Sequence, residues 1–228
     1  MKTMIRHSEA AETNATSLND LKKLVRQGES EFLEFKRKVS FPEKVVCEML
    51  AFANTHGGTL LIGVSDDGGI PGVKHPDEEI FVLENALSTT VRPSIKTRRS
   101  VIEIEPHRFV VRYDVSESKR KPHYFLGPDR KREVYIRHAD KTIQASNEMK
   151  EILRRSNNKR NIQFRYNDQV AMLMQFLHSH PTISLEQYQH LTGMNRYRAS
   201  RSLVLLVLAN VLHVIPSDRG DRYAVKPI

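Results

Sequence analysis

The sequence predicts an α+β protein made of two domains. The first part of the chain mixes amphipathic helical segments with short strand-like runs, whereas residues 167–228 carry helical segments followed by a single hairpin. A polar segment at 157–166 separates the two patterns and predicts a linker. We therefore expect one domain at 17–156 and a second at 167–228. Residues 1–16 are polar and are expected to form a disordered tail.

Each element of the first domain has its own local signal. Proline at position 42 suits the first turn of a helix, and the acidic residues 77–79 suit the positive end of another. Pro106 predicts the turn of a hairpin. The expected elements are helix 17–28, a strand from residue 29, helix 42–55, strand 59–64, helix 77–90, hairpin strands 101–105 and 107–113, strand 133–137 and helix 147–155.

The second domain has the pattern of a DNA-binding module. Helices are expected at 168–179, 185–191 and 196–209, with a hairpin of 213–215 and 222–225 after them. Ser184 followed by Gln187 is a capping-box signature, and Gly193 begins a tight turn between the second and third helices. Two helices joined by a short glycine-containing turn and followed by a hairpin indicate a winged helix-turn-helix.

The third helix of this module is basic at its start and apolar towards its end. Arg196, Tyr197, Arg198 and Arg201 fall in its first turns, whereas 203–208 is entirely apolar. The apolar half would anchor the helix, and the basic half would meet the major groove of DNA. Arg219 and Arg222 in the hairpin are expected to contact the phosphate backbone. The alternative is a protein-binding module whose arginines are merely solvated.

The charge balance agrees with a nucleic-acid partner. The chain has 36 Lys and Arg against 27 Asp and Glu, a net charge of +9, although a well-solvated basic protein is an equally good explanation of charge alone. Residues 157–228 hold nine basic and four acidic residues, so they contribute +5 of this charge. We expect duplex DNA, or RNA, as the partner, and a homodimer as the assembly. Further basic residues expected to contact nucleic acid are Lys119, Arg120, Lys121, Arg130, Lys131 and Arg132.

Several other classes of protein are not expected. Cys47 is the only cysteine, which excludes an internal disulfide and a cysteine-based zinc site. The longest apolar run, 203–208, is far shorter than the ~20 residues that span a bilayer. With no secretory signal at the start, we expect a soluble cytoplasmic protein without a membrane partner. ATP binding is not expected, because neither glycine pair belongs to a GxxxxGK[ST] loop.

Four sequence blocks together resemble the Schlafen-type AlbA domain over residues 17–155. They are Glu29-x4-Glu34-Phe35-Lys36, AFANTHGGTLLIGV at 51–64, Asp66-Asp67-Gly68 with a glycine at position 72, and YIRHADKTIQA at 135–145. Ala139 stands where this family usually has glycine.

The resemblance has two functional implications. Many bacterial members join this domain to a helix-turn-helix and look like transcriptional regulators. Some vertebrate relatives cleave RNA with a three-carboxylate site, whose matching positions here are Glu29, Glu34 and Asp66, with Asp67 as an alternative third residue. The three carboxylates of such a site would bind Mg²⁺ or Mn²⁺, so the same residues would be metal-binding and catalytic. Lys36 lies on the same strand face as Glu34 and is expected to contact phosphate.

The same carboxylates have a structural explanation, as polar ends of a half-exposed sheet beside a glycine turn. The sequence therefore predicts a DNA-binding transcriptional regulator that needs no cofactor. The alternatives are a metal-dependent endoribonuclease or nuclease and a protein-interaction adaptor.

Overall fold

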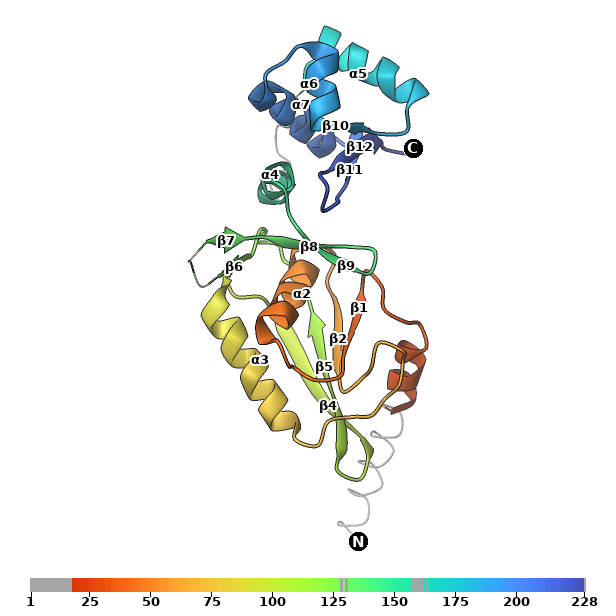
Figure 1. Cartoon of the computed structure of the whole chain (residues 1–228), viewed down its shortest axis with the longest axis vertical. Helices are drawn as coiled ribbons and strands as arrows, with labels where there is room; N and C mark the ends of the chain where they lie inside the picture. The colour runs from red at the N-terminus through yellow and green to blue at the C-terminus, as the bar shows by residue number, and fades with distance from the viewer. Residues whose placement is uncertain (1–17, 128, 130, 157–161, 163, 228) are drawn as a thin grey trace. The chain divides into compact units, whose positions relative to one another are not determined.

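The structure, a computed structural model, describes residues 18–127, 129, 131–156, 162 and 164–227. It divides into two compact units (Figure 1): the described residues up to 118 with 123–142, and residues 119–122 with the described residues from 143 on. The division falls before the helix at 147–156, which the sequence assigned to the first domain. The expected tail at 1–16 lies outside the described residues, as does most of the expected linker.

The first unit is built on a mixed four-stranded sheet in the order β1-β2-β5-β4. β1 (Leu33–Lys36) runs parallel to β2 (Gly58–Ile62), and β5 (Arg108–Val115) is antiparallel to both β2 and β4 (Thr97–Glu105). The β4–β5 hairpin turns at 106–107 as expected, but β4 begins four residues earlier than the sequence pattern predicts.

Helices cover both faces of this sheet. α2 (Pro42–Asn54) and α3 (Pro76–Thr90) pack on one face, and the helical residues 18–25 pack on the other (Figure 1). Because side chains alternate along a strand, Leu60 and Ile62 join the α2 side of the core while Leu61 joins the opposite side. The same alternation in β1 puts Glu34, which pairs in register with Leu60, on the α2 side.

Several short strands complete the first unit, and the sequence predicted only one of them, at 133–137. β3 (Val91–Arg92), β6 (Tyr124–Leu126) and β7 (Arg132–Glu133) form a small sheet. β8 (Tyr135–His138) and β9 (Lys141–Gln144) form a separate two-stranded sheet. Strands of two or three residues bury too few apolar side chains to leave a periodic signal.

The glycines of the 51–64 block allow close approach of the chain. A Cβ atom on Gly58 would lie 2.3 Å from the Phe52 ring, and one on Gly57 would lie 2.8 Å from the carbonyl oxygen of Val115. Gly57 also has a positive φ of 77°. The recognisable sequence block is therefore required by packing between the end of α2 and the sheet.

The second unit contains α4 (Asn147–Ser156), α5 (Asp168–Ser179), α6 (Leu185–Thr192) and α7 (Arg196–Leu208). Its three-stranded antiparallel sheet has the order β10-β12-β11, from Ile183–Ser184, Arg222–Val225 and Leu212–Ile215. The expected capping box of α6 is present, and Gly193 ends that helix with a φ of 67°. β10 was not predicted.

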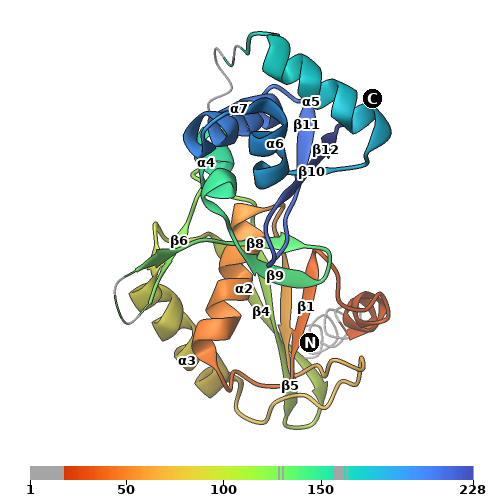
Figure 2. The same ribbon diagram turned by 45° about the horizontal axis from the view of Figure 1, so that its top comes forward.

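The core of the second unit joins its helices to its small sheet. Leu173, Tyr188, Leu203 and Tyr223 are each almost completely buried in one cluster. α4 packs separately on α7 through Ile152 (Figure 2). None of the helices within the described residues is long and apolar enough to cross a membrane.

Candidate functional site

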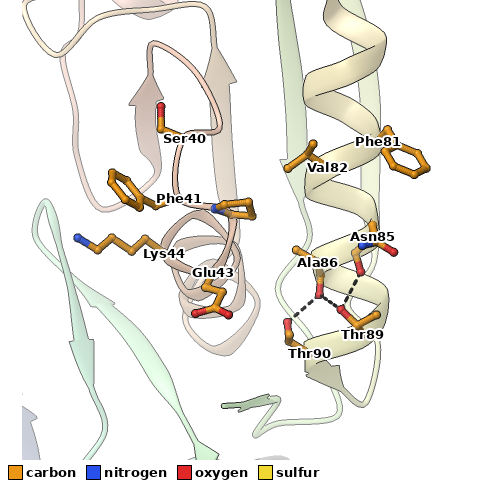
Figure 3. Close-up of a pocket in the computed structure, with 11 residues that line it drawn as sticks. Ser40, Phe41, Glu43, Lys44, Phe81, Val82, Asn85, Ala86, Thr89 and Thr90 are labelled. Carbon is orange, nitrogen blue, oxygen red and sulfur yellow. Dashed lines mark hydrogen bonds between the residues drawn. The ribbon is translucent and has the colours of Figure 1, made fainter. Parts of the chain in front are cut away.

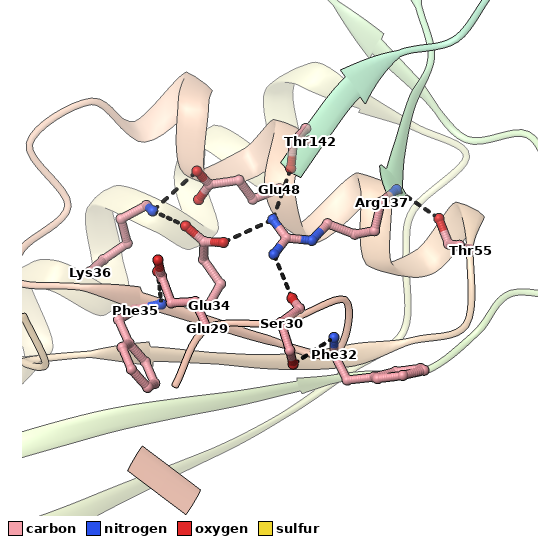
Figure 4. A network of polar contacts seen from close by, with 10 residues as sticks. All are labelled: Glu29, Ser30, Phe32, Glu34, Phe35, Lys36, Glu48, Thr55, Arg137 and Thr142. Carbon is pink, nitrogen blue, oxygen red and sulfur yellow. Dashed lines mark hydrogen bonds and ion pairs between the residues drawn. The ribbon is translucent and has the colours of Figure 1, made fainter. Parts of the chain in front are cut away.

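Glu34, the centre of the acidic sequence motif, forms buried ion pairs with two cations. Its side chain on β1 is only 8% exposed. Arg137 Nη1 on β8 donates to Glu34 Oε2 at 2.8 Å, and the Lys36 ammonium contacts Glu34 Oε1 (Figure 4). Both oxygens of this carboxylate are therefore engaged by positive charges.

Arg137 connects several segments of the first unit. Its Nη2 donates to the Ser30 carbonyl oxygen at 2.7 Å and its Nη1 also reaches Thr142 Oγ1 at 3.2 Å (Figure 4). The guanidinium carbon lies 5.0 Å from the centroid of the Phe52 ring, a cation–π contact. Its Nε is buried and has no hydrogen-bond partner among the described residues. The side chain is 1% exposed, so these contacts replace its hydration.

Lys36 is shared between Glu34 and Glu48. Its Nζ lies 3.1 Å from Oε1 of Glu48, which projects from α2. Burial by itself would lower the pKa of Lys36, but the hydrogen bond to Glu34 and the charge of Glu48 outweigh it and leave the pKa raised. Burial, with the charge of Glu34 added, raises the pKa of Glu48 to about 7. The Oε2 atom of Glu48 is buried without a partner among the described residues.

The other two residues of the expected three-carboxylate site make different contacts from those of Glu34. Glu29 Oε1 accepts a hydrogen bond from the backbone N–H of Phe35 at 2.9 Å. Partial burial raises the pKa of Glu29, and the charges of Glu34 and Asp66 raise it further. Asp66 is exposed in the turn after β2. Its neighbour Asp67 accepts from the Gly69 N–H at 2.9 Å, the arrangement of an ordinary turn.

These residues do not fit a resident metal ion. Within the described parts of the chain, no group of at least three His, Cys, Asp or Glu side chains is arranged to hold one. A divalent ion at Glu34 would compete with Lys36 and Arg137, because each oxygen already contacts one of them. Lys36 is likewise paired with the carboxylates of Glu34 and Glu48, and its expected contact with phosphate stays a prediction.

Two hollows of the first unit lie outside the predicted site. One, of about 340 Å³, is lined by Cys47, Glu48 and Tyr135 among others. The other, of about 510 Å³, lies between the start of α2 and α3 and is mainly apolar (Figure 3). Phe41 and Phe81 line it and are 66% and 73% exposed. It contains none of the candidate site residues that the sequence analysis named.

The predicted DNA-reading residues are together on one exposed part of α7. Arg196, Tyr197, Arg198 and Arg201 are all exposed, whereas Leu203 is completely buried. Asn195 caps the helix, its Oδ1 accepting from the Arg198 N–H at 2.9 Å. The basic first turns therefore begin at a capped helix end, with one backbone N–H satisfied by the cap.

The remaining basic residues are spread over both units. Arg219 and Arg222 are exposed at the β11–β12 hairpin, where Arg222 Nε donates to Thr182 Oγ1 at 3.2 Å. Residues 119–121 belong to the second unit and 131–132 to the first. The Arg132 guanidinium carbon lies 5.6 Å from the centroid of the Tyr124 ring. Arg130 lies outside the described residues.

Sequence reasoning missed the structural roles of Arg137, Glu48 and Asn54. The Asn54 side chain is fully buried, donating to the carbonyl oxygens of His123 (3.1 Å) and Tyr135 (3.0 Å) and accepting from the His123 N–H (2.7 Å). Each of these partners is far away in the sequence. A buried polar residue at the end of an apolar helix was the available signal, because such a group requires partners.

The fold and these contacts define an α+β domain, with a mixed sheet and a buried carboxylate–guanidinium pair, joined to a unit of helices and a small sheet. A model of the family described as Schlafen, AlbA_2 matches residues 29–146, just over half of the 228-residue chain, and the chain belongs to that family. The match takes in Glu29, Glu34 and Arg137 but stops before α4.

Comparison with other proteins adds little to this assignment. The crystal structure of the DIP2311 protein from Corynebacterium diphtheriae is similar with 17% identity and a TM-score of 0.41, over 56% of this chain and 24% of that one. So low a score carries no inference. No curated protein matches the chain significantly.

Proposed function

We propose that the protein is a DNA-binding transcriptional regulator whose second unit is a winged helix-turn-helix. The order helix, strand, helix, helix and hairpin supports this assignment, with α6 and α7 joined by a tight turn at Gly193. The observation that carries the proposal is the division of α7 into an exposed basic start and a buried apolar end.

The exposed side chains suit different parts of a DNA duplex. Arg198 and Arg201 on α7 can donate two parallel hydrogen bonds to a guanine edge, the commonest base-specific contact. Arg219 and Arg222 on the hairpin suit the phosphate backbone, which positions a protein without reading sequence. Binding of this kind requires no cofactor.

The first unit agrees with this function. Schlafen, AlbA_2 domains are commonly found in proteins thought to be transcriptional regulators. We propose that this unit adds basic surface through Lys131 and Arg132 and joins two copies of the chain. A dimer would present paired α7 helices to half-sites one helical turn apart. Sedimentation equilibrium of the full chain tests for this assembly.

The function is tested by selecting binding sites from a random duplex pool with the full chain. A regulator enriches one motif, whose half-site repeat reports a dimer. If no sequence motif is enriched above its frequency in the starting pool, the protein binds DNA only non-specifically. Failure to retain any DNA or RNA at low salt would overturn the proposal and favour the adaptor alternative.

A further inference from the structure

α4 is an integral part of the second unit. The Glu148 side chain accepts from Ser200 Oγ on α7 at 2.6 Å. Ile152 shares an apolar cluster with Val204 and Leu208 of α7. These contacts cover one side of the later turns of α7. Arg196, Arg198 and Arg201 in its first turns remain exposed.

A basic hollow of about 440 Å³ lies between α4 and the exposed start of α7. The side chains that give it its chemical character are Glu151, Arg154 and Arg155 from α4 and Tyr197, Ser200 and Arg201 from α7. Its ionic groups are three arginines and one glutamate, a local charge of +2. Such a concave surface with guanidinium groups and the Tyr197 hydroxyl suits an anion with several oxygens.

Arg201 places this hollow beside the DNA-reading face. A second hollow on α7 is lined by Arg198, Arg201 and Leu205, together with Arg165 and the start of α5. Successive residues of a helix are rotated by roughly 100° about its axis. Viewed down that axis, the position of Arg201 therefore falls between those of Tyr197 and Arg198. Arg201 accordingly stands on a ridge with a hollow on either side. A helix in the major groove has a phosphate strand on each side in the same way.

We propose that the hollow between α4 and α7 binds a backbone phosphate of duplex DNA, next to the major groove that α7 enters. This inference rests on the proposed function and adds to it a contact from outside the three helices of the winged helix. Arg154 and Arg155 are the phosphate-binding residues.

Glu151 regulates the strength of this site. Arg154 donates to its two oxygens at 2.9 and 2.7 Å, and Arg155 Nη1 lies 4.0 Å from Oε1. The hydrogen bond from Arg154 holds the pKa of Glu151 below its usual value, so the carboxylate is charged at neutral pH. A phosphate entering the hollow competes with this carboxylate for the guanidinium groups. Arg154 is 64% exposed and can exchange one anion for the other.

Binding of the full chain to a mixed-sequence duplex, measured across a salt series, tests the proposal. Arg154→Gln with Arg155→Gln should weaken binding roughly three- to tenfold and reduce the salt slope by about one to two. Glu151→Gln should tighten binding by about twofold or more, since it removes the competing anion. A merely structural role for α4 predicts no gain. Glu105→Gln, at an exposed position of β4, makes the same charge change in the first unit and should leave binding unchanged.

The outcomes separate this inference from the proposed function. If alanine substitution of Arg198 and Arg201 weakens binding while the α4 variants bind like the wild type, α7 reads DNA and the phosphate site on α4 is wrong. If Glu151→Gln and Glu105→Gln strengthen binding equally, the effect is net charge and the site is also wrong. If neither the α7 nor the α4 variants change the salt slope, the proposed function itself fails. Circular dichroism confirms that each variant is folded.

Discussion

Arg137 on β8 and Glu34 on β1 form a buried ion pair, with Nη1 of the arginine 2.8 Å from Oε2 of the glutamate. The pair joins two sequence blocks that are more than a hundred residues apart. It gives the acidic motif a structural role that needs no catalysis. The charge of Glu34 is tolerated in the core because Arg137 and Lys36 compensate it, and Glu34 in turn compensates the charge of Arg137.

Removal of the Glu34 charge should destabilise the protein strongly. Glu34→Gln leaves Arg137 buried without its carboxylate, and we expect the free energy of unfolding to fall by about 3 kcal/mol. Urea denaturation measures this change. Asp66→Asn removes the same charge from an exposed member of the acidic trio and should cost about 0.5 kcal/mol or less. Equal costs for the two variants would show that the buried pair does not stabilise the fold.

Divalent metals should have little effect on the protein. Since both oxygens of Glu34 contact cations, adding Mg²⁺ or Mn²⁺ should not raise the melting temperature. We also expect no metal-dependent cleavage of single-stranded RNA or DNA at high protein concentration. A thermal-shift titration and a cleavage assay test these statements. Cleavage that needs Mn²⁺ and is lost in Glu34→Gln, in a variant still folded at the assay temperature, would restore the nuclease alternative.

Glu48 should make stability depend on pH. Its pKa rises from 4.5 to about 7 on folding, so the folded protein binds more protons than the unfolded chain between these values. The contribution of Glu48 to the free energy of unfolding is therefore complete below 4.5 and is lost as the pH rises towards 7, with a slope of at most ~1.4 kcal/mol per pH unit.

Urea denaturation of the wild type and Glu48→Gln across this pH window isolates the contribution. Subtracting the free energy of unfolding of the variant from that of the wild type removes the contribution of the titrating groups that both proteins share, including Glu29 and Glu151. The wild type should lose more stability than the variant as the pH rises. Identical slopes would mean that Glu48 titrates normally in the folded state.

Ala139 offers a stabilising substitution. It lies in the turn between β8 and β9 with a φ of 53°, a conformation that favours glycine, and its side chain is exposed. Ala139→Gly should raise the free energy of unfolding by about 1 kcal/mol, because the strain of a left-handed alanine is removed. Asn210→Gly is the control, at a φ of 60°, since asparagine tolerates this region better. A loss of stability in Ala139→Gly would contradict this explanation.

The longer elements could be predicted from the sequence because their signals are local. α5 has the predicted bounds, and the capping box at Ser184 was also predicted correctly. β2, by contrast, ends at Ile62 instead of residue 64. Gly63 has a φ of 102°, and a Cβ atom there would lie 2.9 Å from the Phe109 carbonyl oxygen, a tertiary contact that no local pattern contains.

The candidate site was less predictable for the same reason. The sequence predicted that Glu34 and Lys36 share one face of the strand, and the structure agrees. It did not predict that Arg137 pairs with Glu34. Arg137 lies 103 residues further along the chain. Which cation meets a buried carboxylate depends on the segments that the fold brings beside it, and no local sequence pattern contains that information.

Salt-dependent DNA binding by a variant of α7 tests the proposed function most directly. Anisotropy of a labelled duplex should show that Arg198→Ala with Arg201→Ala binds at least about tenfold more weakly, with a salt slope reduced by about two. Arg26→Ala with Arg37→Ala removes the same charge from exposed positions of the first unit and should bind like the wild type. An unchanged affinity and salt slope in the α7 variant would contradict the assignment of α7 as the DNA-reading helix.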